Sequence, residues 1–406
     1  MNAPSVYLTH RTRQKRLILP MSRRLFFTVA IVATFAAGPL PLAGQDGADE
    51  ITPTSEAALE RGLTWLAKNQ GVEGNWGSND LGLVSMGALA FMSAGHAPGR
   101  GKYGRELEQA LEFIVSRSRP SGLLNISDGQ RDMYNHGLAT FVLGQAHGMS
   151  TSKDRKLNRV LDNALKLIAA TQCEDGGWDY RAQRQAYGHD LSLAVMQAKA
   201  LRSAVDSGLE VPPEVIDLAI RSVRDHYATR GGRGLPESEQ QKLPGQFTYS
   251  KGGGGGTIAM AAAGVVCLQE FGQYDDWRIA KNMEVIQAAI HETPRSRTHD
   301  GSMPFDAYTL YYVGQALYQV GGETWTKHYP LLRDYLVESQ MNDTGNPQEH
   351  GTWRDHGARG GGRVGGKDGQ LYATSVACFV LAIPNRYLPI LQEGKIEGFR
   401  TKAGGN

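Results

Sequence analysis

The sequence predicts an all-α protein in which six helical hairpins form an inner and an outer ring of helices. Two observations support this prediction. A helical segment followed by a glutamine, a glycine-rich turn and a tryptophan occurs three times, and from residue 56 onward the helical segments alternate between two compositions. Repeats of this kind typically form stacked units, each of which buries its apolar face against its neighbours.

The repeated turns share one order of residues. They occupy residues 65–76 (WLAKNQGVEGNW), 172–180 (QCEDGGWDY) and 335–353 (YLVESQMNDTGNPQEHGTW). Glycine allows the backbone to end a helix and reverse direction. Tryptophan offers a large apolar surface with one N–H donor. We therefore expect Trp76, Trp178 and Trp353 to fix each turn against the preceding outer helix or the next repeat.

The predicted helices pair along the chain into six hairpins. The pairs are 56–70 with 81–94, 106–117 with 135–148, 157–171 with 190–207, 213–229 with 257–271, 277–291 with 307–320, and 326–340 with 371–383. The first member of each pair is amphipathic, as in ALERGLTWLAKNQ. The second is nearly uncharged and rich in small residues, as in TIAMAAAGVVCL. A helix that is apolar all round is buried on all sides, so the second helices are expected to form the inner ring.

The N-terminal segment has the layout of an export signal. Six basic residues precede the apolar run 25–37, and GPLPLAG follows it. We predict a signal peptide over residues 1–43, with Met21 as a possible true start, and export to the periplasm or the medium without a stable transmembrane anchor. An uncleaved anchor is the alternative. Residues 44–55 are predicted to be a linker, 56–391 the ring domain, and 392–406 a C-terminal tail.

The net charge argues against nucleic acid as a partner. The whole chain has 43 Lys and Arg against 41 Asp and Glu, and the predicted signal peptide contains six of the basic residues and no acidic residue. The remaining chain therefore has a net charge of −4. Three cysteines, Cys173, Cys267 and Cys378, are too few for a disulfide framework.

Six hairpins with such turns resemble the α/α-toroid superfamily, which includes squalene and terpenoid cyclases with their QW-type repeats and the β subunits of protein prenyltransferases. The resemblance covers about residues 56–391. It implies that the inner helices run parallel and that their N-terminal ends meet at a central cavity.

The catalytic signatures of that superfamily are not matched. The cyclases have a DxDD motif whose middle aspartate protonates an alkene, and here the best match is Tyr187-Gly188-His189-Asp190. The prenyltransferases bind zinc with an Asp-x-Cys pair, whereas Val265 and Val376 stand two residues before Cys267 and Cys378. We therefore predict neither squalene-type cyclisation nor zinc-dependent prenyl transfer, and we assign no metal and no cofactor.

The candidate site lies at the predicted mouth, just before the inner helices. His136, His189, Asp190 and Asp306 are the candidate catalytic residues, because a set of acids and bases with different intrinsic pKa values suits proton transfer. The candidate ligand-binding residues are Asp132, Tyr187, Tyr249, Arg359 and Arg363. Aspartates before helices also act as simple N-caps. The glycine-rich stretches 251–260 and 359–370 are either anion-binding or merely flexible.

Three functions remain open from the sequence. The first is a cavity protein that binds or modifies an isoprenoid or another lipid. The second is a carbohydrate-active lyase or hydrolase, because many such enzymes use a related (α/α)6 barrel. The third is a non-catalytic binding scaffold. In each case the ligand, a small molecule or a glycan, would occupy the central cavity. The polarity of the ring interior separates the first two hypotheses, since fold alone decides none of them.

Overall fold

The computed structural model describes residues 50–149, 154–232, 234–292, 305–342, 345–355 and 366–391. The predicted signal peptide, the C-terminal tail, Arg359 and Arg363 lie outside these residues.

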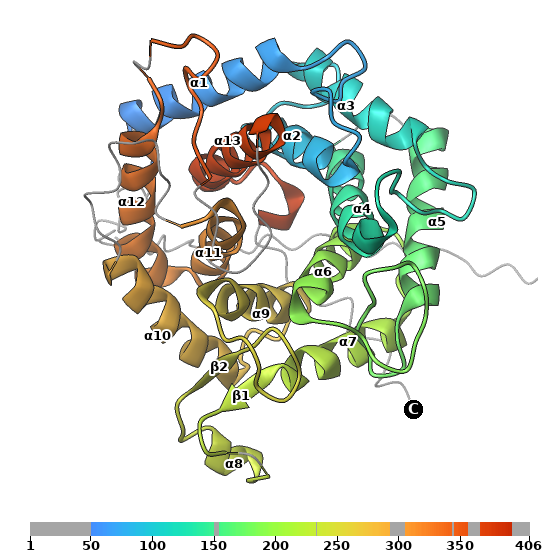
Figure 1. Ribbon diagram of the computed structural model, residues 1–406, viewed down its shortest axis with the longest axis vertical. Coiled ribbons are helices and arrows are strands. Elements are labelled where there is room, and N and C mark those ends of the chain that lie inside the picture. Colours follow the sequence, from blue (N-terminus) through green and yellow to red (C-terminus); the bar gives the residue numbers. More distant parts are fainter. Residues whose placement is uncertain are drawn as a thin grey trace, which may run out of the picture. The chain divides into compact units, whose positions relative to one another are not determined.

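Twelve helices form six consecutive hairpins, and Figure 1 shows one ring of helices inside another. The outer helices are α1 (Pro53–Asn69), α3 (Gly104–Ser116), α5 (Arg155–Thr171), α7 (Pro213–Asp225), α10 (Trp277–Glu292) and α12 (Gly322–Ser339). The inner helices are α2 (Leu81–Ser93), α4 (Asp132–Met149), α6 (Leu191–Asp206), α9 (Ile258–Glu270), α11 (Ala307–Val320) and α13 (Gly366–Ala382). The predicted α/α toroid is confirmed.

The two rings differ in burial, as their compositions predict. Every residue of α2 is buried, and so is every residue of α9 except Ile258. In α5, by contrast, the buried residues lie at helical spacing along one face, among them Leu161, Leu165 and Ile168. The inner ring closes on itself because α13 packs against both α11 and α2. The small-residue helices are therefore enclosed by the amphipathic ones.

One set of hydrogen bonds is repeated in the three Gln–Gly–Trp turns. The indole of Trp178 donates to the carbonyl of Ile168 in the preceding outer helix at 2.9 Å. The side-chain amide of Gln172 donates to Gly176 O in its own turn at 3.1 Å and to Val215 O in the next outer helix at 2.9 Å. The equivalent donors in the other two turns are Trp76 and Gln70, and Trp353 and Gln340. The tryptophans are thus structural, as predicted, and each glutamine joins its hairpin to the next one.

The glycine of the turn makes this junction possible. Gly176 has a φ of +83°, and a Cβ atom there would lie 2.1 Å from the carbonyl oxygen of Leu218 in α7. A larger residue would therefore be strained and would also clash with the backbone of the next outer helix. Gly74 and Gly351 have positive φ values and meet the backbones of α3 and α1 in the same way.

The second hairpin has neither the glutamine nor the tryptophan in its turn, and His136 replaces part of their function. The Leu124 amide donates to Nδ1 of His136 at 3.1 Å, and Nε2 lies 3.1 Å from the carbonyl of Ala164 in α5. Because Nδ1 accepts a hydrogen bond, Nε2 carries the proton and donates. The ring therefore connects its own turn to the next outer helix.

Several predicted boundaries are wrong. Helix α1 begins at Pro53 with Thr52 as its N-cap, so the predicted linker ends earlier than residue 55 and Ser55 lies inside the helix. Helix α4 begins at Asp132, three residues before the predicted start, which puts His136 beyond the first turn rather than at the start of the helix. Residues Tyr227–Thr229 are not helical: they form strand β1, antiparallel to β2 (Gly245–Phe247). These strands and the short helix α8 (Glu237–Gln240) project from the outer ring beside α7 (Figure 1).

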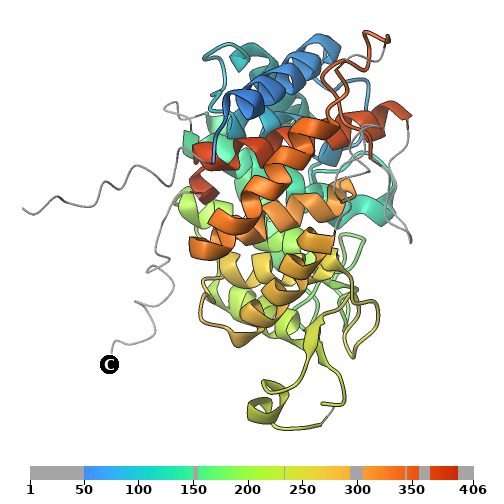
Figure 2. The ribbon, with the colours of Figure 1, turned by 90° about the vertical axis from the view of Figure 1, so that its left-hand side faces the viewer.

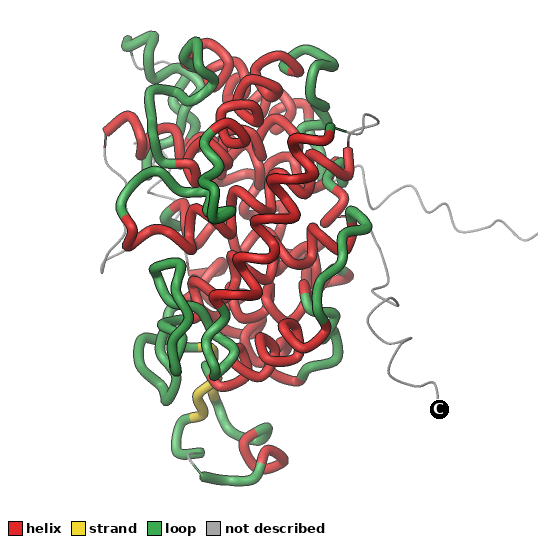
Figure 3. The backbone as a smooth tube through the Cα atoms, turned by 90° about the vertical axis from the view of Figure 1, so that its right-hand side faces the viewer, coloured by secondary structure: helices red, strands yellow, loops and turns green. Residues whose placement is uncertain are grey.

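The two ends of the ring are different. Figures 2 and 3 show the longer loops gathered at the end where the inner helices begin. The other end is covered by two short 3-10 turns, η3 (Ile383–Asn385) and η4 (Pro389–Leu391). The Ile390 amide donates to Gln145 Oε1 of α4 at 3.0 Å, and the Tyr318 hydroxyl of α11 donates to the Leu391 carbonyl. The described residues therefore cover the C-terminal ends of these inner helices. None of the helices in the described residues is both long and apolar enough to cross a bilayer.

Candidate functional site

The N-terminal ends of the inner helices lie together, as the resemblance implies. Arg131, just before α4, forms an ion pair of 3.4 Å with Asp80, the N-cap of α2. The hydroxyl of Tyr134 in α4 contacts that of Ser192 in α6. The Leu191 amide at the start of α6 donates to the carbonyl of Tyr249, which precedes α9, at 3.2 Å. We call this end of the ring the mouth.

Asp190 is the centre of a polar cluster at the mouth. Its Oδ1 accepts from the Ser192 amide at 3.0 Å, so it caps α6, and it also accepts from the Ser192 hydroxyl. Its Oδ2 accepts from the Tyr180 hydroxyl. The Tyr180 oxygen contacts the Tyr249 hydroxyl, and the Ser192 oxygen contacts the Tyr134 hydroxyl. We call Tyr134, Tyr180, Asp190, Ser192 and Tyr249 the mouth cluster.

The donors in this cluster all point toward the carboxylate. Since Tyr180 and Ser192 donate their only hydroxyl protons to Asp190, they accept from Tyr249 and Tyr134. Each oxygen of Asp190 therefore lies at the end of a chain of two hydroxyls. Asp190 is 3% exposed and Tyr249 is 39% exposed, so one of these chains joins a buried carboxylate to the surface.

The phenols of the cluster are neutral at ordinary pH. Burial is the main cause that raises the pKa of Tyr180, and its hydrogen bond to Asp190 raises it further. Burial also raises the pKa of Tyr134 and of Tyr249. A phenol held in its protonated form can donate or relay a hydrogen bond, but it is a poor base. The cluster therefore combines one carboxylate with neutral hydroxyl groups.

Two loops bring these side chains together. The segment that ends in Asp190 is fixed to the third turn, where the His189 amide donates to Trp178 O at 2.8 Å. The carbonyl of Tyr180 accepts from the amide of Met133 in α4 at 3.0 Å. The ring of His189 lies 4.4 Å from that of Tyr180, centroid to centroid. His189 itself is exposed, so these two rings form part of the mouth surface.

The structure brings together only some of the predicted site residues. His189, Asp190 and Tyr249 lie at the mouth cluster, and Tyr187 is 77% exposed on the adjacent loop. Two of the other predicted residues make structural contacts. Asp132 accepts from the Asn125 side chain at 2.8 Å, and Asp306 caps α11 by accepting from the Thr309 amide at 3.0 Å.

His136 has no ring nitrogen available to a ligand, because both nitrogens bond to backbone groups and the side chain is fully buried. Burial lowers its pKa to about 4. It was predicted to be catalytic on the assumption that it precedes the inner helix, and that assumption is wrong. Sequence reasoning also missed Tyr180 and Ser192 as site residues. Their signals are weak: Tyr180 ends the third turn, and Ser192 follows a helix-capping aspartate.

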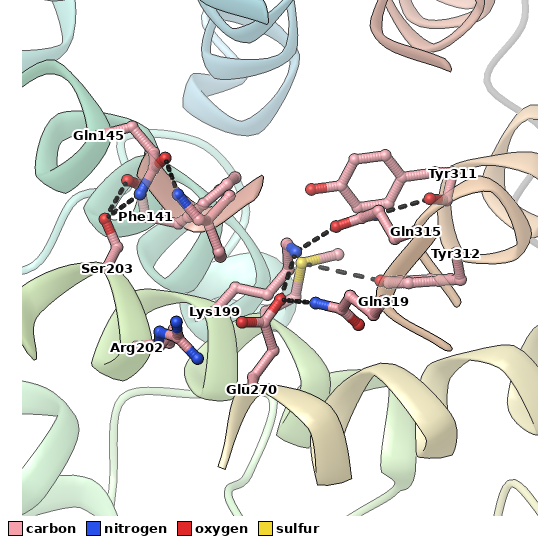
Figure 4. Close-up of polar contacts among 12 residues, drawn as sticks. Phe141, Gln145, Lys199, Arg202, Ser203, Glu270, Tyr311, Tyr312, Gln315 and Gln319 are labelled. Carbon is pink, nitrogen blue, oxygen red and sulfur yellow. Dashed lines mark hydrogen bonds and ion pairs between the residues drawn. The ribbon is translucent and has the colours of Figure 1, made fainter. Parts of the chain in front are cut away.

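A second polar cluster lies deeper in the inner ring (Figure 4). Lys199 of α6 forms an ion pair of 3.1 Å with Glu270 of α9 and donates to Gln315 of α11. Gln319 donates to the same Glu270 oxygen at 2.9 Å. Lys199 and Glu270 are each 1% exposed. We call Lys199, Glu270, Gln315 and Gln319 the interior cluster.

Burial lowers the pKa of Lys199, while Glu270 and the aromatic neighbours of the interior cluster act in the opposite direction and favour its positive charge. Its Nζ lies 4.8 Å from the centroid of the Phe141 ring and 5.8 Å from that of Tyr311. Cations are attracted to ring faces at such distances. The interior of the ring is therefore partly polar and charged rather than uniformly apolar.

A surface groove of 610 Å³ runs along α3 on the outside of the ring, and the residues that line it include Val72, Glu108 and Phe113. It shares no residue with the mouth cluster. The described residues contain no group of three or more His, Cys, Asp or Glu side chains arranged to hold a metal ion.

No model of a known protein family matches the sequence, and no curated protein matches it. Solved structures match its fold. An inactive variant of the GH76A α-1,6-mannanase of Salegentibacter sp. HEL1_6, in complex with α-1,6-mannotriose, aligns with a TM-score of 0.51 and 9% identity, over 82% of this chain and 99% of that one. Cellobiose 2-epimerase from Spirochaeta thermophila aligns with a TM-score of 0.53 and 13% identity, over 81% of this chain and 95% of that one. A type II terpene cyclase variant from Scytonema aligns with a TM-score of 0.49 and 12% identity, over 82% and 98%. At these identities the first two similarities establish the α/α-toroid fold and nothing further.

Proposed function

We propose that this protein is carbohydrate-active and that a glycan binds at the mouth cluster. The observation that carries the proposal is the convergence of two hydroxyl chains on Asp190, one of which reaches the surface at Tyr249. Sugars present both hydroxyl groups and apolar C–H faces. The mouth offers matching groups, namely phenol hydroxyls and the adjacent rings of Tyr180 and His189.

The same arrangement supplies a route for one proton. A sugar hydroxyl that gives its proton to the Tyr249 oxygen would allow Tyr249 to pass its own proton to Tyr180, and Tyr180 to pass its proton to Oδ2 of Asp190. Asp190 would then act as the general base while the phenols stay neutral before and after the transfer. This fits the raised pKa values of Tyr180 and Tyr249, which disfavour a phenolate.

A lipid or isoprenoid ligand has less support. It requires a mainly apolar interior, whereas the interior cluster contains a buried Lys199–Glu270 pair and two glutamines. Among the fold neighbours described above, the mannanase and the cellobiose epimerase have TM-scores above 0.5. We also propose that the chain is exported, as its N-terminal 43 residues predict, which would bring it to extracellular or periplasmic glycans.

The proposal can be tested by titrating the purified protein with α-1,6-mannotriose, cellobiose and a wider panel of oligosaccharides in a calorimeter, with geranylgeraniol as the isoprenoid probe. At least one saccharide should bind. Tyr180→Phe, which breaks the link between Tyr249 and Asp190, should weaken that binding by about tenfold. Tyr387→Phe is the matched control, because Tyr387 packs against Gly95 at the opposite end of the ring.

Two results would refute the proposal: binding of the isoprenoid alone, or a saccharide affinity that Tyr180→Phe leaves unchanged. Proton NMR of the bound saccharide over time then separates an enzyme from a binding protein, since cleavage and epimerisation both change the anomeric signals.

A further inference from the structure

Three segments of the chain meet at the carboxylate of Asp175, in the third turn. Its Oδ1 accepts from the amide of Gly177 at 3.1 Å and from that of Gly188 at 2.9 Å. Its Oδ2 accepts from Nζ of Lys251 at 2.7 Å. Lys251 belongs to the fourth hairpin, 76 residues further along the chain. One side chain therefore joins the third turn, the loop that leads into α6, and the loop that leads into α9.

Both distant partners of Asp175 are next to the mouth cluster. Gly188 comes two residues before Asp190, and Lys251 comes two residues after Tyr249. The Tyr249 carbonyl accepts from the amide of Leu191, so the two segments also contact each other directly. The ion pair of Lys251 with Asp175 therefore holds the segment that follows Tyr249 against the segment that carries Asp190.

The loop that carries Tyr249 is anchored before that residue by Thr248, whose amide and hydroxyl donate to the His226 carbonyl at 2.9 and 2.8 Å, and it is less firmly attached after it. Lys251 is followed by five glycines, residues 252–256, which have no side chains to pack. Gly252, Gly253 and Gly255 have φ values of +88°, +106° and +73°. The loop folds back through two hydrogen bonds of 3.1 Å, from the Tyr249 amide to Gly255 and from the Ser250 amide to Gly254. Glycine-rich backbone has a high entropy when it is free, so a side-chain tether has a large effect on its position.

The ion pair is sheltered from solvent. The side chains of Lys251 and Asp175 are 25% and 15% exposed, whereas the surface pair of Lys166 and Asp162 is 71% and 57% exposed. Burial acts to raise the pKa of Asp175, but the hydrogen bonds from Lys251, Gly188 and Gly177 outweigh it and lower that pKa. A partly buried pair with these added hydrogen bonds is worth more than an exposed one.

We propose that Asp175 and Lys251 are positioning residues of the glycan site, and that their ion pair holds Tyr249 in contact with Tyr180 and Asp190. This inference rests on the proposed function for its ligand. The structural part of the inference, which is the placement of Tyr249 by the ion pair, does not rest on the proposed function.

The experiment uses Lys251→Met, which removes the charge but keeps the length of the side chain, and Lys251→Arg, which restores the charge. Lys166→Met is the matched control, since it breaks the exposed pair with Asp162. Hydrogen–deuterium exchange reports on the amides of Tyr249, Ser250 and Leu191. Calorimetric titration with α-1,6-mannotriose and cellobiose reports on binding, and thermal unfolding reports on the fold.

In Lys251→Met, the three amides should exchange about tenfold faster, and a saccharide that binds the unchanged protein should bind about tenfold more weakly. Lys251→Arg should restore both properties, and Lys166→Met should change neither. The melting temperature should fall only slightly in Lys251→Met, because Asp175 keeps its two backbone amide donors, and it should stay unchanged in Lys166→Met. A tenfold loss of affinity without a matching loss of melting temperature separates a positioning role from a general loss of stability.

The two proposals fail in different ways. If neither saccharide binds the unchanged protein, the proposed ligand fails for these probes, while faster exchange at Tyr249 in Lys251→Met still supports the positioning of Tyr249. If exchange and affinity are both unchanged in Lys251→Met, the positioning role is refuted even though a saccharide binds. A loss of affinity that tracks a lower melting temperature and is not restored by arginine would also refute it.

Discussion

The mouth cluster and the interior cluster each surround one buried carboxylate inside the same ring of helices, but they differ in access. Lys199 and Glu270 are each 1% exposed and bind groups from α6, α9 and α11. The mouth cluster ends at Tyr249, which is 39% exposed. An ionisable group inside a ring of helices is therefore not by itself a site. What distinguishes the mouth is a chain of hydrogen bonds that leads from a buried carboxylate to solvent.

The difference also predicts how each cluster affects stability. A buried ion pair has already lost the hydration of both charges, and one Glu270 oxygen has no hydrogen-bond partner among the described residues. Such a pair adds little to the free energy of unfolding. Removing only one of its two partners is nevertheless costly, because the other charge stays buried. At the mouth, a hydroxyl can be removed while its neighbours keep other partners or reach water.

The largest effect is expected from Lys199→Ala. It removes the cation that is hydrogen-bonded to the buried Glu270 carboxylate and leaves Arg202 as the positive charge that acts on it, and breaking a buried pair from one side costs about 3–5 kcal/mol of unfolding free energy. Urea unfolding at neutral pH measures this cost. The double variant Lys199→Met, Glu270→Leu is the control: it removes both charges together and should cost less than Lys199→Ala, and its remaining cost comes from Gln315 and Gln319, which lose their partners. A loss below about 1 kcal/mol in Lys199→Ala would mean that the interior cluster is hydrated, and the contrast with the mouth would weaken.

The contribution of His136 to the free energy of unfolding is expected to be smaller and to depend on pH. Its pKa is lowered from a usual value of 6.5 to about 4 by burial, so the folded protein stays neutral there while the unfolded chain takes up a proton. Stability from this residue is complete above pH 6.5 and is lost as the pH falls to about 4. The shift corresponds to about 3 kcal/mol.

His136→Gln keeps one donor and one acceptor but does not titrate, so the decline in unfolding free energy between pH 7 and pH 4.5 should become shallower. The buried His226, whose pKa is also lowered to about 4, should account for part of the remaining slope. Urea unfolding at several pH values measures the slope, and His226→Gln provides the comparison. Identical slopes in His136→Gln and the unchanged protein would contradict the assignment.

The ring could be predicted from sequence because it depends on local pattern. The alternation between ALERGLTWLAKNQ and TIAMAAAGVVCL separates outer from inner helices, and each Gln–Gly–Trp turn marks the junction of two hairpins. The start of α4 was missed because Asp132 is itself helical, and residues 132–136 contain no glycine or proline to mark a boundary.

The polar clusters could be predicted only in part. Asp190 and Tyr249 were chosen because both precede inner helices. Tyr180 was taken as part of a turn, because its partnership with Tyr249, 69 residues away, is a tertiary contact. Lys199 lies in a segment expected to be nearly uncharged, and its partner Glu270 is 71 residues distant. Such pairings depend on which helices become neighbours in the ring, and residue spacing does not record this.

The smallest effect on stability is expected from Tyr249→Phe, and it gives the sharpest comparison with Lys199→Ala. The substitution removes one hydroxyl, keeps the ring, and leaves Tyr180 still donating to Asp190, so no buried group loses its only partner. The loss of one partly exposed hydrogen bond should cost about 1 kcal/mol or less.

If the mouth binds glycans, the same change removes the group at the surface end of the chain and should weaken saccharide binding about tenfold in a calorimetric titration. The two clusters then respond in opposite ways: one change destabilises the ring without touching the proposed ligand site, and the other weakens recognition in a stable ring. Should Tyr249→Phe instead destabilise the protein as much as Lys199→Ala does, the mouth cluster is a structural network like the interior one, and the glycan site must lie elsewhere.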